Sequence, residues 1–345
     1  MIRLGVIGFG HIGRIHCEAA QRVAGAKLAS VATRHPEEVR RLYGPDINIC
    51  TTYSDLGRDV PLDAVVVCTP TYLHEEHVLA AVKQGLHVLC EKPFALDLAA
   101  AHRMLAGARQ NKAVLMIAQV LRFWPPYVRI KQAVDSGEIG TVQGITAYRL
   151  AQYPTWGDWF RDPQKSGGVL LDMQVHDVDF IYWLLGAPEE VYAAGVRSAT
   201  GSWDHVCTTL RYPGAVVGIE SSYLLPDSWP FSCGIRVIGS VASSEYTFRV
   251  AGNVEQRQQA TSRLVMYQSN GQIEEPPVSS EDMYVAQLQY FVDCLEGGHA
   301  PQRCLPEDSY HVMEIMEACR ESLSTSAPVR LDTSTSRREN AQLVE

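Results

Sequence analysis

Two side chains in the second half of the chain have the types and spacing that acid–base chemistry requires. Asp172 and His176 are four residues apart in the run 167–186, whose apolar residues recur at helical spacing. Residues at this spacing are neighbours on one helix face, so the carboxylate can fix the tautomer of the imidazole. Such a pair suits proton transfer; the alternative is a solvated surface pair. Asp179, three residues further on, is either a second orienting group or polar packing.

A lysine in the first half is also placed for chemistry. The apolar run that begins at Leu86 ends in Glu91, Lys92 and Pro93. Proline cannot donate a ladder hydrogen bond, so we expect a buried strand to stop here. Ligands in open α/β sheets bind outside the carboxyl ends of the strands. Lys92 is therefore predicted to act together with functional groups from another part of the chain. The alternative is a solvated lysine in a loop.

A glycine-rich turn close to the N-terminus predicts a nucleotide site. Residues 8–13 follow the pattern G-x-G-x-x-G between an expected strand (2–8) and an expected helix (12–23). The first glycine makes the tight turn, the second admits a pyrophosphate, and the third lets the helix pack close to the strand. The helix N-terminus then attracts the phosphates. The residues expected at the dinucleotide are Gly8, Phe9, Gly10, His11, Ile12 and Gly13.

The end of the second expected strand, 27–32, bears on the choice of cofactor. NAD-specific sites place Asp or Glu about 20 residues beyond the glycines, where it binds the ribose 2′-hydroxyl. This chain has Thr33 there, followed by Arg34. A carboxylate would repel a 2′-phosphate, whereas Thr and Arg can bind one. The pattern favours NADP over NAD, although Arg34 could also point to water.

The first half alternates strands with helices. Further strands are expected at 64–68, 86–93 and 114–119, which predicts a doubly wound parallel sheet of the α/β class. Thr69 and Pro70 close the strand at 64–68, and His74 in the first turn of the next helix is a plausible cofactor contact. His77 is expected at the surface. No metal site is expected, because these histidines have no carboxylate or cysteine partner in view.

The second half changes character. Segments 142–150, 190–195, 206–212, 216–223, 234–238 and 245–250 read as consecutive strands, which predicts a largely antiparallel sheet. Such a sheet must cover one face, and self-association is one way to do so. We therefore expect a homodimer or homotetramer with this sheet at the contact.

Length and composition bound the organisation and the class of protein. With 345 residues, two domains are expected: a dinucleotide-binding domain (1–121) and a substrate-binding and oligomerisation domain (122–331), followed by a polar, flexible tail (332–345). A net charge of −9 argues against a general nucleic-acid binder. No apolar run reaches the length of a membrane span and no signal peptide is evident. The nine scattered cysteines indicate reduced thiols in a cytoplasmic protein.

Taken together and in this order, the motifs resemble the Gfo/Idh/MocA family, most closely its inositol and sugar dehydrogenases. The similarity covers about residues 1–330 and is carried by Gly8–Gly13, Thr69-Pro70-x-x-x-His74, Glu91-Lys92-Pro93, Arg122-Phe123 and Gly-Gly-x-x-x-Asp172-x-x-x-His176-x-x-Asp179. The resemblance implies a nucleotide-binding Rossmann domain and an α/β domain with an open, mostly antiparallel sheet whose face forms the oligomer contact.

The resemblance also implies roles for individual residues. Lys92, Asp172 and His176 are the implied catalytic set, and Arg122 and Tyr284 are candidate substrate contacts. Trp156, in the aromatic loop 153–160, could wall a sugar pocket or pack an interface. Cofactor contacts are expected from the glycine-rich turn and from Thr33, Arg34, Thr69, Pro70, His74, Glu91 and Lys92. Thr33 departs from the Asp of many NAD-using relatives and leaves NAD as the alternative to NADP.

The expected activity is hydride transfer between nicotinamide and a secondary alcohol of a sugar, inositol or related polyol. His176 would accept the hydroxyl proton, Asp172 would orient His176, and Lys92 would hydrogen-bond the reacting oxygen. One alternative is a glycoside-cleaving enzyme that holds NAD tightly, and another is a non-catalytic NADP-binding regulator. The presence of all three polar residues counts against the regulator.

Overall fold

The computed structural model describes residues 1–155, 157–250 and 260–332 and divides into two compact units. The first contains residues 1–123 and 281–310, and the second contains residues 124–280 and 311–345. A single boundary near residue 121 was expected. The structure differs from this prediction because residues 281–310 belong to the first unit. Of the expected tail, residues 333–345 lie outside the described part of the chain.

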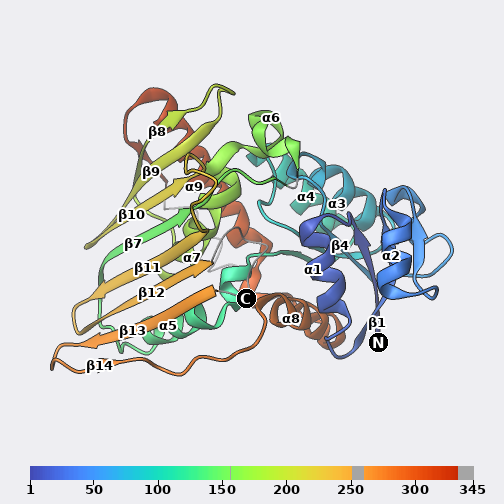
Figure 1. Cartoon of the computed structure of the whole chain (residues 1–345), viewed down its shortest axis with the longest axis horizontal. Coiled ribbons are helices and arrows are strands. Elements are labelled where there is room, and N and C mark those ends of the chain that lie inside the picture. The colour runs from blue at the N-terminus through green and yellow to red at the C-terminus, as the bar shows by residue number, and fades with distance from the viewer. Residues whose placement is uncertain (156, 251–259, 333–345) are drawn as a thin grey trace. The chain divides into compact units, whose positions relative to one another are not determined.

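The first unit is built on a parallel sheet with the strand order β3-β2-β1-β4-β5-β6 (Figure 1). The strands are β1 (Ile2–Ile7), β2 (Ala26–Ala32), β3 (Asn48–Cys50), β4 (Ala64–Val67), β5 (His87–Cys90) and β6 (Leu115–Ile117). This order is that of a dinucleotide-binding Rossmann fold, so the doubly wound sheet is confirmed. Strand β3 was not predicted, because three residues are too few to show a period.

Helices cover this sheet, which explains why its strands read as continuous apolar runs. They are α1 (His11–Ala20), α2 (Pro36–Tyr43), α3 (His74–Lys83), α4 (Leu98–Gln110) and α8 (Met283–Gly297). The last of these comes from far along the chain. Leu288 and Phe291 of α8 are fully buried in the same apolar core as β1 and α1, and Asp282 caps the helix through the N–H groups of Tyr284 and Val285. This packing draws 281–310 into the first unit.

The second unit contains a larger sheet. Among the described residues its strand order is β14-β13-β12-β11-β7-β10-β9-β8-β15, and every neighbouring pair is antiparallel except β7 with β10. The strands are β7 (Val142–Leu150), β8 (Glu190–Arg197), β9 (Trp203–Tyr212), β10 (Ala215–Ser222), β11 (Ser232–Gly239), β12 (Ala242–Val250), β13 (Ala260–Gln268), β14 (Ile273–Glu274) and β15 (Val329–Arg330). The mostly antiparallel sheet is confirmed; β13 and the short outer strands were not predicted.

Burial alternates along these strands, so the sheet has one covered and one open face. Helices α5 (Pro125–Asp135), α7 (Val175–Leu185) and α9 (Pro306–Thr325) lie on the covered face (Figure 1). The N–H of Ala193 on β8 donates to Ser322 Oγ of α9 at 2.9 Å, a contact that fixes this helix to the sheet. The open face is the one available for self-association.

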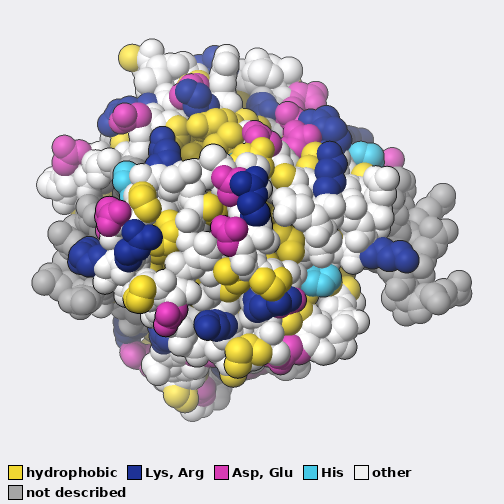
Figure 2. All heavy atoms as spheres, turned by 90° about the vertical axis from the view of Figure 1, so that its right-hand side faces the viewer, with side chains coloured by type: hydrophobic (Ala, Val, Ile, Leu, Met, Phe, Trp, Pro, Cys, Tyr) yellow, Lys and Arg dark blue, Asp and Glu magenta, His cyan; other side chains and the backbone are white. Residues whose placement is uncertain are grey.

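The described surface mixes charges of both signs. Figure 2 shows Lys and Arg side chains interspersed with Asp and Glu across one face, together with scattered apolar side chains. No helix within residues 1–155, 157–250 and 260–332 has the length and apolar character needed to cross a bilayer. All nine cysteines are free thiols, and only Cys207 is exposed among them.

Candidate active site

The glycine-rich turn has the geometry that a dinucleotide needs. Gly8 has φ +96°, and a Cβ there would lie 2.9 Å from the carbonyl oxygen of Cys68. A Cβ on Gly13 would lie 2.0 Å from the carbonyl oxygen of Gly8, so only glycine lets α1 approach β1 this closely. Gly10 caps α1, and a Cβ there would meet nothing within 4 Å. The open space at Gly10 beside the helix N-terminus fits a pyrophosphate.

The other residues of the turn divide by exposure. Phe9 is only 4% exposed and packs in the core, so its backbone alone can face a ligand. His11 and Ile12 are half-buried in the first turn of α1, where N–H groups lack helical acceptors. The turn therefore offers backbone donors rather than side chains to the phosphates.

The end of β2 places Thr33 and Arg34 differently. Thr33 is 5% exposed, and its Oγ1 accepts the N–H of His35 at 2.9 Å. Its hydroxyl proton can still be donated to a ligand. Arg34 is exposed, which leaves both the predicted phosphate contact and the alternative, a solvated side chain, compatible with the fold.

Two histidines beyond β4 are buried. His74 is 1% exposed, with Nδ1 2.9 Å from the carbonyl oxygen of Pro93 and Nε2 2.9 Å from that of Thr69. Burial lowers the pKa of His74, and the two carbonyl oxygens oppose that shift because they favour the protonated ring. A polar cofactor contact by His74 would have to break one of these bonds, so the predicted contact finds no support.

His77 corrects a second expectation. It was expected at the surface but is 5% exposed, with its ring 4.3 Å from that of Tyr53 and Nδ1 2.9 Å from Thr69 Oγ1. Burial lowers the pKa of His77. The helix pattern around His77 was too short to show which face is covered.

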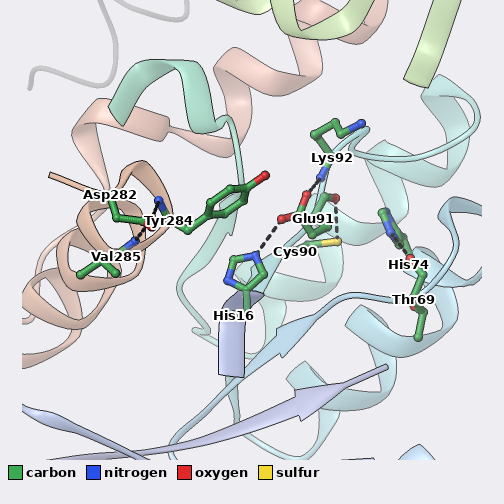
Figure 3. Close-up of polar contacts among 9 residues, drawn as sticks. All are labelled: His16, Thr69, His74, Cys90, Glu91, Lys92, Asp282, Tyr284 and Val285. Atoms are coloured by element: carbon green, nitrogen blue, oxygen red, sulfur yellow. Dashed lines mark hydrogen bonds and ion pairs between the residues drawn. The ribbon is translucent and has the colours of Figure 1, made fainter. Parts of the chain in front are cut away.

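Glu91 and Lys92 follow directly after β5, as expected. Glu91 is 6% exposed, and Lys92 is half-buried. One Glu91 oxygen, Oε1, lies 2.7 Å from His16 Nε2, and the other, Oε2, accepts the backbone N–H of Lys92 at 3.1 Å (Figure 3). The carboxylate thus joins helix α1 to the backbone of the lysine.

Three predicted substrate contacts have different outcomes. Arg122 is 0% exposed and donates to Asp308 Oδ2 and to the carbonyl oxygen of Arg303, each at 2.9 Å. A guanidinium buried in this way has no exposed atom for a substrate, so that prediction finds no support. Tyr284 is 7% exposed and lies edge-on to the His16 ring at 5.7 Å (Figure 3), and its contact with a substrate stays a prediction. Trp156 lies outside the described residues.

In the second unit, Asp172 and His176 lie on consecutive turns, but the helix is not uniform. Residues Leu170–Gln174 form a π-helical turn, and α7 begins at Val175. Asp172 and His176 are both half-buried. Single π-turns widen the backbone spacing and are frequent at functional sites, so the i,i+4 geometry expected for a regular helix does not apply unchanged.

A tyrosine from a distant strand end holds Asp172. The hydroxyl of Tyr223, 4% exposed, donates to Asp172 Oδ2 across 51 positions of sequence. Burial and the charge of Asp172 raise the pKa of Tyr223 well above its usual value, so the phenol stays protonated and remains a donor. Its ring stacks on that of Tyr153 at 5.0 Å. This donor was not predicted.

The residue after His176 belongs to a buried ion pair. Asp177 is 2% exposed, and its carboxylate accepts hydrogen bonds from Arg149 Nε at 3.0 Å and from Arg149 Nη2 at 2.9 Å. This bidentate contact joins α7 to β7 beside the candidate base. Asp179 is 1% exposed and so belongs to the interior rather than to an open surface.

Comparison with known proteins adds an independent finding. A family model described as "Oxidoreductase family, NAD-binding Rossmann fold" matches residues 2–119, and the GFO/IDH/MocA C-terminal domain matches residues 127–245. The chain belongs to the Gfo/Idh/MocA oxidoreductase family. The resemblance read from the motifs is thereby confirmed, and so is the assignment of the chain as an oxidoreductase.

Individual members of the Gfo/Idh/MocA family match over nearly the whole chain. Myo-inositol 2-dehydrogenase of Thermotoga maritima is 28% identical, with 96% of this chain and 99% of the relative covered. D-xylose 1-dehydrogenase (NADP(+)) 2 of Haloferax volcanii is 29% identical, with 95% and 99% covered. The crystal structure of a probable dehydrogenase from Thermotoga maritima is 26% identical, covers 95% of this chain and 99% of its own, and superposes with a TM-score of 0.75.

Proposed function

We propose that this protein transfers hydride between a nicotinamide cofactor and a secondary alcohol of a sugar, inositol or related polyol. The observation that carries the proposal is the turn between β1 and α1, whose glycines leave open space at Gly10 and a helix N-terminus facing it. The substrate class is supported by the names of relatives that match over nearly the whole chain, such as the myo-inositol and D-xylose dehydrogenases.

The chain's own residues would supply the proton chemistry. Nicotinamide, when bound, supplies the hydride acceptor or donor. His176 would take the hydroxyl proton in oxidation and return it in reduction, because histidine is the side chain whose ordinary pKa suits this task. Asp172, held by Tyr223, would orient the imidazole. Lys92 would hydrogen-bond the reacting oxygen and favour its alkoxide character.

Turnover tests the proposal directly. The purified protein is mixed with NADP or NAD and a panel of inositols, aldoses and other polyols, and the absorbance of the reduced nicotinamide is followed. We expect net reduction with at least one polyol. Glycoside cleavage without net reduction would favour the enzyme that holds NAD tightly, and binding of cofactor without any turnover would favour the regulator.

Cofactor choice is a separate part of the proposal. Arg34 is exposed and directly follows Thr33 after the end of β2, and the Haloferax relative is named for NADP(+). Arg34→Ala should weaken NADP binding by about 1.5–3 kcal/mol, the contribution of a hydrogen bond to a charged group, and leave NAD binding nearly unchanged. Titration of both cofactors measures this. Lys27→Ala, which removes an exposed charge at the other end of β2, is the control. Equal affinities of the native protein for NADP and NAD would contradict the preference.

Self-association is the third part of the proposal. The open face of the large sheet carries exposed apolar side chains on four of its strands, β8, β10, β11 and β13: Tyr192, Val196, Val216, Ile238 and Tyr267. Contact with a second copy would remove this apolar area from water, so we propose a homodimer or homotetramer that meets through this face.

A charge on that face should prevent assembly. Val216, 56% exposed on β10, is flanked by strands on both sides. Val216→Glu should shift the mass measured by light scattering toward the monomer, because a carboxylate would be desolvated at the contact. Leu42→Glu, which replaces a 46% exposed leucine on α2, should leave the mass unchanged. A native protein that is monomeric at micromolar concentration would rule the proposal out.

A further inference from the structure

Lys92 lies between two residues that buried histidines hold. Before it, the Glu91 carboxylate is 2.7 Å from His16 Nε2. After it, the carbonyl oxygen of Pro93 is 2.9 Å from His74 Nδ1. Figure 3 shows the contact between His16 and Glu91, and it shows His16 and His74 on opposite sides of Lys92 within the first unit. The short segment that carries the lysine is therefore tied at both ends.

His16 bonds a side chain of this segment through one ring nitrogen, whereas His74 bonds two backbone carbonyl oxygens. His16 is 0% exposed, and its Nδ1 has no hydrogen-bond partner among the described residues. An imidazole costs free energy to bury unless its polar atoms are used. Its hydrogen bond to Glu91 is what offsets that cost. A carboxylate only accepts hydrogen bonds, so His16 presents its Nε2–H to Glu91.

The Glu91 carboxylate uses its two oxygens for different partners. Oε1 meets His16, and Oε2 accepts the backbone N–H of Lys92 at 3.1 Å. Turning the carboxylate to suit another donor would release one of these contacts. The peptide plane at Lys92, and with it the direction in which the side chain leaves the backbone, is thus fixed by the position of His16.

Helix α1 connects this arrangement to the nucleotide site. His16 lies on α1, the helix that begins beside Gly10 at the proposed phosphate position. The Tyr284 ring lies edge-on to His16 at 5.7 Å and covers it from α8. The same rigid helix therefore faces the phosphates at its N-terminus and holds the residue before Lys92 further along.

We propose that His16 is a positioning residue for Lys92: through the Glu91 carboxylate it fixes the lysine relative to the helix that binds the cofactor phosphates. The inference builds on the proposed function, in which Lys92 acts on the reacting oxygen. His16 touches neither substrate nor cofactor in this role. His74 supports the other side of the same segment through Pro93.

A pair of amide substitutions tests the proposal. The glutamine amide reaches about as far as Nε2 of histidine and can donate to Glu91, whereas the shorter asparagine amide falls near Nδ1 and cannot. His16→Asn should lower kcat by up to about 10²-fold, the effect of a small misplacement of a reacting group, with the Kd of the cofactor unchanged. His16→Gln should recover most of that loss. A substitution that acted only through stability would affect both variants alike.

A measurement without turnover separates this inference from the proposed function. In the cofactor-free protein, the rate at which an amine reagent modifies Lys92 is followed by peptide mass spectrometry. We expect a several-fold faster rate in His16→Asn and the native rate in His16→Gln. His87→Leu, which removes a histidine bonded to the N–H of Val114 at the opposite end of β5, should leave the rate unchanged.

Two results would overturn the inference. One is a native rate of Lys92 modification in folded His16→Asn, and the other is an equal change in the Asn and Gln variants. If His16→Asn does not fold, Glu91→Asp replaces it, because the shorter carboxylate keeps its charge but cannot reach both partners. A native modification rate in Glu91→Asp would be equally decisive against the inference. Absence of polyol turnover in the native protein would instead count against the proposed function alone.

Discussion

His176→Ala is expected to lower turnover by roughly 10²–10⁴-fold, the usual contribution of a positioned general base. The affinity for the cofactor should barely change, because the glycine-rich turn that would hold the phosphates belongs to the first unit and His176 to the second. Steady-state turnover and a cofactor titration on the same preparation measure both quantities. His299→Ala, at an exposed position after α8, serves as the control.

Lys92→Ala should lose a comparable amount of activity. If both side chains act on one reacting oxygen, the double variant should lose less than the product of the two single effects. Near-native turnover of His176→Ala across neutral and alkaline pH would contradict the assignment. Lys92 would then be the proton acceptor, and Asp172 and His176 would form a binding pair.

The sequence predicted those features that local patterns encode. The turn Gly8–Gly13 lies between a strand and a helix, so its role follows from spacing alone, and the structure places the glycines in the expected geometry. Alternation of strands with helices was enough to predict the parallel sheet. The run of strands after residue 142 was likewise enough for the antiparallel one.

Contacts between distant residues could not be predicted in this way. His16 and Glu91 are 75 positions apart, and Tyr223 and Asp172 are 51 apart, so no periodicity joins them. For Arg122 a motif did suggest a role, but distant contacts give this residue a different place. It belongs to a motif and was expected at the substrate, but the complementary charge of Asp308 and the Arg303 carbonyl draw it inside. Helix α8 packs with the first unit because its apolar face fits that core. The position of α8 late in the sequence does not indicate this packing.

Arg149→Ala should destabilise the second unit by about 3–5 kcal/mol, because it leaves the Asp177 carboxylate buried without its partner. Arg149 is 4% exposed and Asp177 2%, and the two form a bidentate contact. Denaturant unfolding followed by tryptophan fluorescence suits this measurement, since all six tryptophans lie between residues 124 and 229. The signal therefore reports on the second unit rather than on the first.

A paired substitution separates the ion pair from the packing around it. Replacing both partners, as Arg149→Met with Asp177→Leu, should cost much less than Arg149→Ala alone, because no unpaired charge remains in the interior. Arg236→Ala, which breaks an exposed pair with Glu245 on the same sheet, should cost at most about 1 kcal/mol. A loss from Arg149→Ala no larger than that of Arg236→Ala would show that the buried pair does not hold α7 on β7. The position of His176, the neighbour of Asp177, would then have to be set by the apolar packing of α7 and by the contacts of the π-helical turn before it, where Gln174 accepts the Thr208 hydroxyl at 2.7 Å.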